Sequence, residues 1–270
     1  MYIYNIKINQ LFQESPLYED LSRPQFQNIF DITISYRDSS DVFNKYGALL
    51  NKSTNERIEH NIVYNEYKNE HIDLKKYEVT ELSERSKDIA WVVSHCDTPS
   101  YRELFVDEMM NYPSLQIDIF GSCGDLELSK DSGVAESYKQ LASEYKFYLS
   151  FENAKCLEYI TEKFFLALEA GMIPVVLGGL SRKDYDEIAP PHSFLHVDDF
   201  SSAEELMKNL TNLSKDPYEY HLYFWWKPYY TFHHNIGLEA NCEFCDLLNV
   251  PNFSSKNNYK NFTSYWNKCR

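Results

Sequence analysis

The sequence predicts an α/β domain of the Rossmann-like class, in which helices cover a parallel sheet. Between residues 89 and 197, apolar runs of strand length alternate with helical patterns, at roughly 30 residues per unit. The run at 89–93, Ile-Ala-Trp-Val-Val, is apolar throughout, which is typical of a strand buried on both faces. Such sheets bind ligands at the carboxyl ends of their strands, often with a phosphate at a helix N-terminus.

The first unit begins with the strand at 89–93. Thr98 and Pro99 then predict a helix start, with Thr98 as the N-cap and Pro99 at the first helical position. The apolar stripe expected on this helix is Leu104, Phe105, Met109 and Tyr112. The next strand is expected at 117–120, where Gly121 ends it.

The same alternation continues downstream. Further strands are expected at 147–151, 173–177 and 194–197. Further helices are expected at 160–170, from Ser202 through Leu213, and from Asp216 and Pro217 onward. Gly171 suits the C-terminal cap of the first of these helices, and Ser202 with Glu205 predicts a capping box on the second.

Two domains are expected, with a boundary near residue 85. Residues 1–85 contain short apolar runs such as 30–36 between polar segments, and this part is not expected to fold by itself. Residues 86–270 contain the alternating pattern and a C-terminal tail. The ligand site is therefore expected in the second part, with the first part packed beside it.

Charge and hydropathy exclude several classes of protein. With 26 Lys and Arg against 41 Asp and Glu, the net charge is −15, which disfavours a nucleic-acid partner. No apolar run approaches the roughly 18 residues that a membrane span needs. The first seven residues do not resemble a signal peptide, so we expect a chain that is soluble or that lacks its N-terminal targeting part.

Cysteines and glycosylation sequons give weaker signals. The cysteines are Cys96, Cys123, Cys156, Cys242, Cys245 and Cys269. Cys242 and Cys245 form a lone CxxC, without the second pair or the histidines that a zinc site needs. Sequons occur at Asn51, Asn209, Asn212, Asn252 and Asn261, which favours a secretory compartment.

The densest group of chemically versatile residues lies where the 147–151 strand gives way to the next helix. Asn153, Tyr159, Glu162 and Lys163 bring an amide, a hydroxyl, a carboxylate and an ammonium group together there. A nucleotide-diphosphate sugar needs this mixture, because cations and N–H donors take the charge that builds on a departing diphosphate. A capped, solvated helix start with a Glu-Lys pair fits the pattern equally well.

Arg102 is a second candidate, since it lies in the first turn of the helix that follows the 89–93 strand. A cation is unusual at that position because a helix N-terminus favours negative charge. On the pattern alone, an ordinary surface arginine is the simpler interpretation.

Several longer motifs occur in a fixed order along most of the chain, from about residue 14 to residue 245. They are Ile-Thr-Ile-Ser-Tyr-Arg-Asp at 32–38 with Tyr46-Gly47, Trp-Val-Val-Ser at 91–94 with Arg102, Phe-Tyr-Leu-Ser-Phe-Glu-Asn at 147–153, Glu-Tyr-Ile-Thr-Glu-Lys at 158–163, Ala-Gly-Met-Ile-Pro-Val-Val-Leu-Gly at 170–178, and Phe-Leu-His-Val-Asp-Asp-Phe at 194–200. Together they resemble the signature of the alpha-1,3/4-fucosyltransferases of glycosyltransferase family 10.

The resemblance implies a GT-B fold whose Rossmann-like C-terminal domain binds GDP-fucose, with a truncated N-terminal part. By matching position, Arg102 and Lys163 would hold the diphosphate. Asn153, Tyr159 and Glu162 would line the donor site, with Ser94 beside it.

The general base of the family is the glutamate of a Glu-Ser-Pro motif, which falls on Glu14-Ser15-Pro16. Without the resemblance, Glu14 would be taken as a solvated loop carboxylate. Because the pKa of a free glutamate is about 4.3, the role of general base also requires a partly desolvated setting that raises the pKa of Glu14.

The family pattern also sets expectations for the cysteines and for the length of the chain. The C-terminal CxxC falls on Cys242 and Cys245, which are expected to be oxidised with each other or with another cysteine. Cys96, Cys123 and Cys156 match the branch that fucosylates the N-glycan core. Matched to the family pattern, this sequence is expected to lack the type II membrane anchor and most of the N-terminal domain. His95 stands in place of the usual Asn. Glu127-Leu128 stand where that branch carries a cysteine.

The function expected from the resemblance is inverting transfer of L-fucose from GDP-fucose to an N-glycan or another GlcNAc-containing acceptor in alpha-1,3 linkage. The parent family acts in the Golgi lumen. No cofactor or bound metal is expected to be required, with a divalent cation as an optional stimulant. The alternatives are a catalytically inactive nucleotide-sugar-binding module, or a fragment of a longer fucosyltransferase. A Rossmann-like binder of another cofactor is disfavoured because no GxGxxG follows an expected strand.

Overall fold

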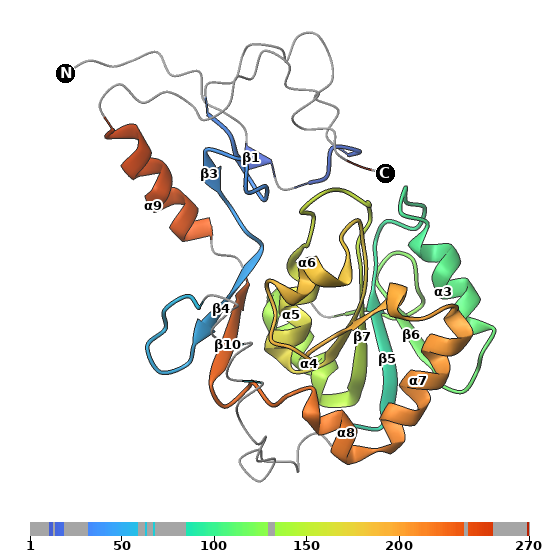
Figure 1. Ribbon diagram of the computed structural model, residues 1–270. Coiled ribbons are helices and arrows are strands. Elements are labelled where there is room, and N and C mark those ends of the chain that lie inside the picture. Colours follow the sequence, from blue (N-terminus) through green and yellow to red (C-terminus); the bar gives the residue numbers. More distant parts are fainter. Residues whose placement is uncertain are drawn as a thin grey trace.

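The computed structural model describes residues 11–12, 14–18, 32–58, 63, 67, 85–128, 133–234, 237–250 and 269. Its centre is a five-stranded sheet in the order β6-β5-β7-β8-β9, and every neighbouring pair of strands in it is parallel. Helices cover both faces of this sheet (Figure 1). The predicted Rossmann-like α/β class is therefore confirmed.

The strands of the sheet are β5 (Lys87–Val92), β6 (Ile117–Phe120), β7 (Tyr145–Phe151), β8 (Ile173–Leu177) and β9 (Leu195–His196). The helices of this part are α3 (Arg102–Met110), α4 (Val134–Glu144), α5 (Glu162–Ala170), α6 (Arg182–Asp186), α7 (Ala203–Lys215) and α8 (Pro217–Leu222), with a short 3-10 helix η3 (Val197–Asp199). All the strands expected from the apolar runs are present. The sequence analysis missed α4 and α6.

Each face of the sheet has its own apolar core. On one face, β5, β7 and β8 pack against α3, α7 and α8 through residues such as Val106, Leu149 and Leu206. On the other face, Tyr148 and Ala90 pack against α4 and α5 through Leu141 and Leu166. The central strands are apolar on both sides because both sides are covered.

Several helix boundaries follow the local sequence. Gly171 ends α5 in the left-handed conformation, with φ of 94°. Asp216 caps α8, its Oδ1 accepting from the N–H groups of Tyr218 and Glu219. Ser202 caps α7 by accepting from the Glu205 N–H, but the Glu205 carboxylate accepts from Ser201, so the reciprocal bond is displaced by one residue.

The prediction of Thr98 as an N-cap is wrong. The helix begins at Arg102, three residues after the predicted first helical residue Pro99, and Tyr101 precedes it with φ of 56°. Thr98 lies in a turn closed by the bond from the Tyr101 N–H to the Thr98 carbonyl, and its hydroxyl donates to Glu103 Oε1 at 2.6 Å. The turn delays the helix until the chain has passed over the end of β5.

The part before residue 85 is joined to the sheet domain through a strand pair. Strand β4 (Gly47–Asn51) pairs antiparallel with β10 (Tyr230–His234), and both strands pack against α5. Strands β1 (Leu11–Phe12), β2 (Ile34–Ser35) and β3 (Val42–Phe43) form a small parallel sheet, which lies near α9 (Gly237–Leu248) in Figure 1. The domain boundary near residue 85, and the inability of residues 1–85 to fold alone, stay predictions.

Among the described residues, no helix is both long enough and apolar enough to span a membrane. The sequons at Asn252 and Asn261 lie outside the described residues. Asn209 and Asn212 are exposed on α7.

Candidate functional site

A cavity of about 420 Å³ opens at the carboxyl ends of β5 and β7, beside the first residues of α3 and α5; we call it the sheet-edge cavity. All seven residues that the sequence predicted for the site line it: Glu14, Ser94, Arg102, Asn153, Tyr159, Glu162 and Lys163. The rest of its wall consists of Tyr46, Val92, Val93, His95, Leu128, Val134, Ser137 and Tyr138. Six of the seven meet because loops at the carboxyl ends of adjacent parallel strands share one edge of the sheet, and Glu14 joins them through Tyr159.

Lys163 is held at the start of α5 by three oxygen atoms. Its Nζ donates to Thr161 Oγ1 at 2.7 Å, to Glu152 Oε2 at 3.2 Å and to Glu162 Oε1 at 3.5 Å. Burial alone would lower the pKa of Lys163, but the charges of Glu152 and Glu162 raise it above its ordinary value. The ammonium group therefore keeps its charge, and its longest contact, to the partly exposed Glu162, is the easiest to exchange for a ligand oxygen.

Arg102 is buried, not the surface residue that its position in the sequence suggested. Its side chain is 2% exposed and lies 5.7 Å from the ring centroid of Trp91. Its guanidinium donates to the carbonyls of Phe151 at 2.7 Å and His95 at 3.1 Å. These bonds tie α3 to the end of β7 and to the loop after β5, so the cation is fixed beside the cavity.

Two buried polar atoms at the wall of the cavity have no hydrogen-bond partner among the described residues. The two atoms are Arg102 Nε and Asn153 Oδ1. The ion-pair distance from Arg102 Nε to Glu103 Oε1 is 3.6 Å, too long for a hydrogen bond. Native proteins leave few such atoms unpaired, because each one loses its hydration without compensation. The first is a donor and the second an acceptor, so a ligand with both anionic oxygens and hydroxyl groups would satisfy both.

Tyr159 connects the cavity to the distant Glu14. Its hydroxyl donates to Glu14 Oε2 at 3.2 Å, and its ring packs against those of Tyr36 and Tyr46, with centroids 5.1 Å and 6.3 Å away. Burial, followed by the charge of Glu152, raises the pKa of Tyr159 well above its ordinary value, so the phenol stays a donor. The Glu14 residue itself is exposed, in contrast to the partly desolvated setting expected for it.

The charges on the wall balance, since Arg102 and Lys163 line the cavity together with the carboxylates of Glu14 and Glu162. Ser94 is exposed at the rim. An anion would therefore be bound by directed donors more than by a surplus of positive charge.

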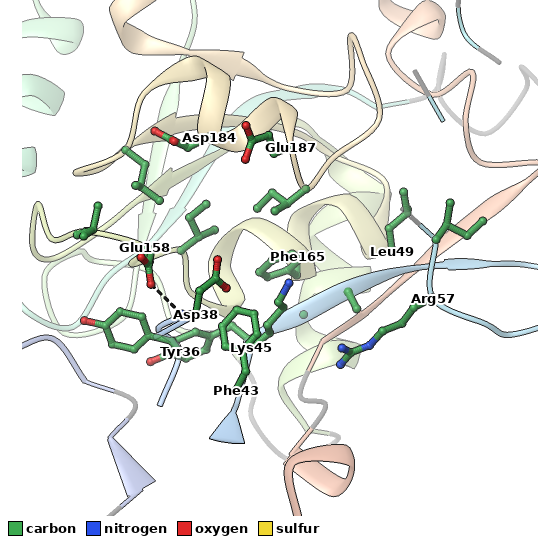
Figure 2. A pocket seen from close by; sticks show the side chains of 18 residues that line it. Tyr36, Asp38, Phe43, Lys45, Leu49, Arg57, Glu158, Phe165, Asp184 and Glu187 are labelled. Atoms are coloured by element: carbon green, nitrogen blue, oxygen red, sulfur yellow. Dashed lines mark hydrogen bonds between the residues drawn. The ribbon is translucent and has the colours of Figure 1, made fainter. Parts of the chain in front are cut away.

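A second cavity, of about 360 Å³, lies beside the first, and Tyr46 lines both. Figure 2 shows Asp184 and Glu187 on one side of this second cavity and Asp38, Lys45 and Arg57 on the other. Its remaining wall is mostly apolar and aromatic: Tyr36, Phe43, Gly47, Ala48, Leu49, Ile58, Leu157, Glu158, Ile160, Phe165, Leu180 and Ile188. Apolar faces with a few carboxylates are typical of a site for an uncharged ligand rich in hydroxyl groups.

A family model described as glycosyltransferase family 10 (fucosyltransferase), C-terminal part, matches residues 82–265. The chain belongs to this family. Alpha-(1,3)-fucosyltransferase C of Drosophila melanogaster is 36% identical over 247 residues, which is 90% of this chain and 56% of that protein. Human alpha-(1,3)-fucosyltransferase 4 is 36% identical over 221 residues, which is 82% of this chain and 37% of that protein. The chain thus spans about half, or less, of these relatives.

Crystal structures of an alpha1,3-fucosyltransferase share the fold. The structure with GDP-fucose aligns with a TM-score of 0.54, and the structure with GDP aligns with a TM-score of 0.56. Each alignment covers 94% of this chain at 17% identity. The alignments cover 79% and 78% of those chains. The GT-B class predicted from the sequence is confirmed.

The disulfides of this family 10 chain differ from the expected pattern. Cys96 pairs with Cys123 and Cys156 with Cys269, whereas Cys242 and Cys245 are exposed free thiols on α9. The prediction that the CxxC is oxidised is therefore wrong for this structure. Since the four other cysteines pair among themselves, no third cysteine is left for either residue, and both side chains of the pair face solvent. The Cys96–Cys123 bridge joins the segments that follow the adjacent strands β5 and β6.

Within the described part of the chain, no cluster of three or more His, Cys, Asp or Glu side chains could hold a metal ion. The absence of a required metal stays a prediction.

Two features of the site, one behind the cavity and one in its wall, were missed by the sequence analysis. The first is Glu152, which belongs to the Phe-Glu-Asn motif but received no role of its own. The second is the wall formed by Val134, Ser137 and Tyr138 of α4. The spacing of Val134, Tyr138 and Leu141 could have revealed this helix, because residues four and seven positions apart share one face.

Proposed function

We propose that this family 10 chain transfers L-fucose from GDP-fucose to a GlcNAc-containing acceptor, such as an N-glycan, in alpha-1,3 linkage with inversion at the anomeric carbon. The observation that carries this proposal is the convergence of seven residues, predicted from separate motifs, on one cavity. Unsatisfied donor and acceptor atoms at its wall support a bound nucleotide sugar. By analogy with the family, the parent protein would act in the Golgi lumen from a membrane anchor.

In this proposal Arg102 and Lys163 bind the diphosphate. Arg102 Nε, which makes no hydrogen bond to a described residue, would donate to one phosphate oxygen, and Lys163 would exchange its contact with Glu162 for a second phosphate oxygen. Glu162, once released, accepts hydrogen bonds from ribose hydroxyls. Asn153 Oδ1 and Ser94 complete the polar wall around the donor.

Glu14 would act as the general base. The acceptor hydroxyl gives its proton to the Glu14 carboxylate while its oxygen attacks the anomeric carbon of fucose. The bond from that carbon to the β-phosphate oxygen breaks on the opposite side, and GDP departs toward Arg102 and Lys163. The Tyr159 hydroxyl, which donates to Glu14 at 3.2 Å, would orient the carboxylate for this step.

The acceptor sugar would approach through the second cavity. Tyr46 lines both cavities, so a glycan seated in the second one lies next to the donor. The apolar and aromatic faces suit the C–H faces of sugar rings, and Asp184 and Glu187 can accept from sugar hydroxyls.

One observation favours the alternative of a catalytically silent nucleotide-sugar-binding module. Glu14 is exposed, and among the described residues its side chain has one hydrogen-bond partner, the Tyr159 hydroxyl. A binding module would need the buried residues of the donor wall but not this carboxylate.

The test combines two measurements on the full chain. Calorimetric titration with GDP asks whether the donor site exists, and transfer of labelled fucose to a GlcNAc-terminated glycan asks whether it acts. Binding with transfer supports the enzyme, and binding without transfer supports the silent module. Absence of both would refute the assignment of the cavity to a nucleotide sugar.

A further inference from the structure

Glu152 is a buried carboxylate directly behind the sheet-edge cavity, and it does not line that cavity. It follows the last residue of β7, it is fully buried, and its N–H donates to the Leu177 carbonyl at 2.8 Å. This bond fixes it between the ends of β7 and β8. A carboxylate in such a place loses its hydration, so its charge must be compensated by close partners.

Within the described residues, the hydrogen-bond partners of the Glu152 carboxylate are Thr161 and Lys163, at the start of α5. Oε1 accepts from the Thr161 N–H at 2.8 Å, the Thr161 hydroxyl lies 3.0 Å and 2.9 Å from the two carboxylate oxygens, and Oε2 accepts from Lys163 Nζ at 3.2 Å. Burial raises the pKa of Glu152, and the charge of Lys163 opposes that rise. The carboxylate thus holds the N-cap residue of α5, Thr161, which makes no side-chain cap bond of its own, and it also neutralises the ammonium group.

We propose that Glu152 is a positioning residue, which holds the Lys163 ammonium group from behind so that it faces the diphosphate of the donor. The inference rests on the proposed function, because it assigns Lys163 to the diphosphate. Glu152 acts through Lys163, since it does not reach the cavity itself. A purely structural role, as a cap of α5, is the competing explanation, and it predicts no dependence on Lys163.

The environment of Lys163 also predicts a pH effect. The charged and titratable groups that face it are Glu152 and Tyr148 from β7 and its end, Glu162 from α5 and Arg102 from α3. With Glu152 neutral, burial and Arg102 both lower the pKa of Lys163, and Glu162 is the main carboxylate left to oppose them. The ammonium form binds the diphosphate, so a lowered pKa makes GDP affinity fall as the pH rises.

The experiment is a double-mutant cycle on GDP affinity with E152Q, K163M and both together. Glutamine keeps an oxygen for the Thr161 N–H but carries no charge. E152Q and K163M are each expected to weaken GDP binding by about 10-fold or more, whereas the double variant is no weaker than K163M alone. E169Q is the matched control, because Glu169 lies on the same helix but pairs with His234, and its GDP affinity should equal that of the wild type.

The pH profile supplies a readout that a cap alone would not change. Between about pH 7 and 9.5, E152Q should lose GDP affinity more steeply than the wild type, and the extra loss should vanish in the double variant. Additive single effects, or an E152Q profile parallel to the wild type, would overturn the proposal. Wild-type protein that does not bind GDP would instead refute the proposed function.

Folding of the variants is also informative. Removing one partner of a buried pair is far more destabilising than removing both. If E152Q does not fold, the double variant should regain a cooperative unfolding transition. Failure of the double variant to recover would mean that Glu152 acts independently of Lys163, and the proposal would be wrong.

Discussion

The two sides of the sheet-edge cavity are built in different ways. On the sheet side, Glu152 and Arg102 are buried and Lys163 is largely so. Arg102 and Lys163 each donate at least two hydrogen bonds to backbone or side-chain oxygens, and Glu152 accepts from the Thr161 N–H and from Lys163 Nζ. On the opposite side, Glu14 and Ser94 are exposed, and Glu14 reaches the rest of the site through Tyr159. The groups assigned to the leaving diphosphate are thus part of the folded core, whereas the proposed base is an exposed residue bonded to that core through Tyr159.

The difference has a functional consequence. A site formed by the ends of packed strands and helices keeps its geometry as long as the domain is folded. A carboxylate held through one hydrogen bond depends on whatever else surrounds it. Donor binding should therefore tolerate changes to the segment around Glu14, and transfer should not.

The largest difference between the two sides is expected for Glu14→Gln. We expect fucose transfer to fall by about 10²- to 10⁴-fold, because the amide cannot accept the acceptor proton. GDP affinity should stay close to that of the wild type, because Glu14 does not touch the groups assigned to the diphosphate. Transfer assays and calorimetry on the same preparation would check both halves, and near-normal transfer would move the search for the base to other acidic residues along the cavity.

Changes on the buried side should show the opposite pattern. Lys163→Ala and Arg102→Ala are each expected to reduce GDP binding by about 1.5–3 kcal/mol, the value of a hydrogen bond to a charged group. Calorimetric titration measures this, with Lys208→Ala as a control cation that is exposed on α7 and pairs with Glu204. Unchanged affinity in both Lys163→Ala and Arg102→Ala would contradict the assignment.

Gly47→Ala would disturb the contact between the two parts of the chain. A Cβ at Gly47 would overlap the ring of Phe165 on α5, so β4 must shift away from the helix. Overpacking of this kind costs about 1–3 kcal/mol in the free energy of unfolding. Urea denaturation should show this loss of stability. Ala48→Ser, on the same strand, is the comparison variant. A fully stable Gly47→Ala variant would mean that β4 is held more loosely than the structure indicates.

The smallest effect is expected at the cysteines of α9. Cys242→Ser and Cys245→Ser should each change the free energy of unfolding by no more than about 0.5 kcal/mol, since both thiols are exposed and unpaired. Thiol titration of the unreduced, unfolded protein should count two free thiols. Fewer than two would show that the pair is oxidised in the mature protein, as the family pattern had predicted.

The amino-acid sequence by itself determined the class of the fold and most of its regular elements. Apolar runs such as 117–120 and 173–177 became strands with these bounds, and Gly171 and Asp216 ended and began helices as expected. These features depend on neighbours within a few residues, so a local pattern is sufficient to specify them. The family motifs also named seven residues that turned out to share one cavity.

Only the tertiary structure decided the features that depend on distant partners. The turn over the end of β5 moved the start of α3 past Thr98, and pairing with β10 gave β4 its place on α5. The cysteine partners, the burial of Arg102 and the contact between Glu152 and Lys163 likewise join residues that the sequence does not place together. Parallel strands need long connections, so the side chains that meet at their ends come from widely separated segments, and no local pattern states which of them will touch.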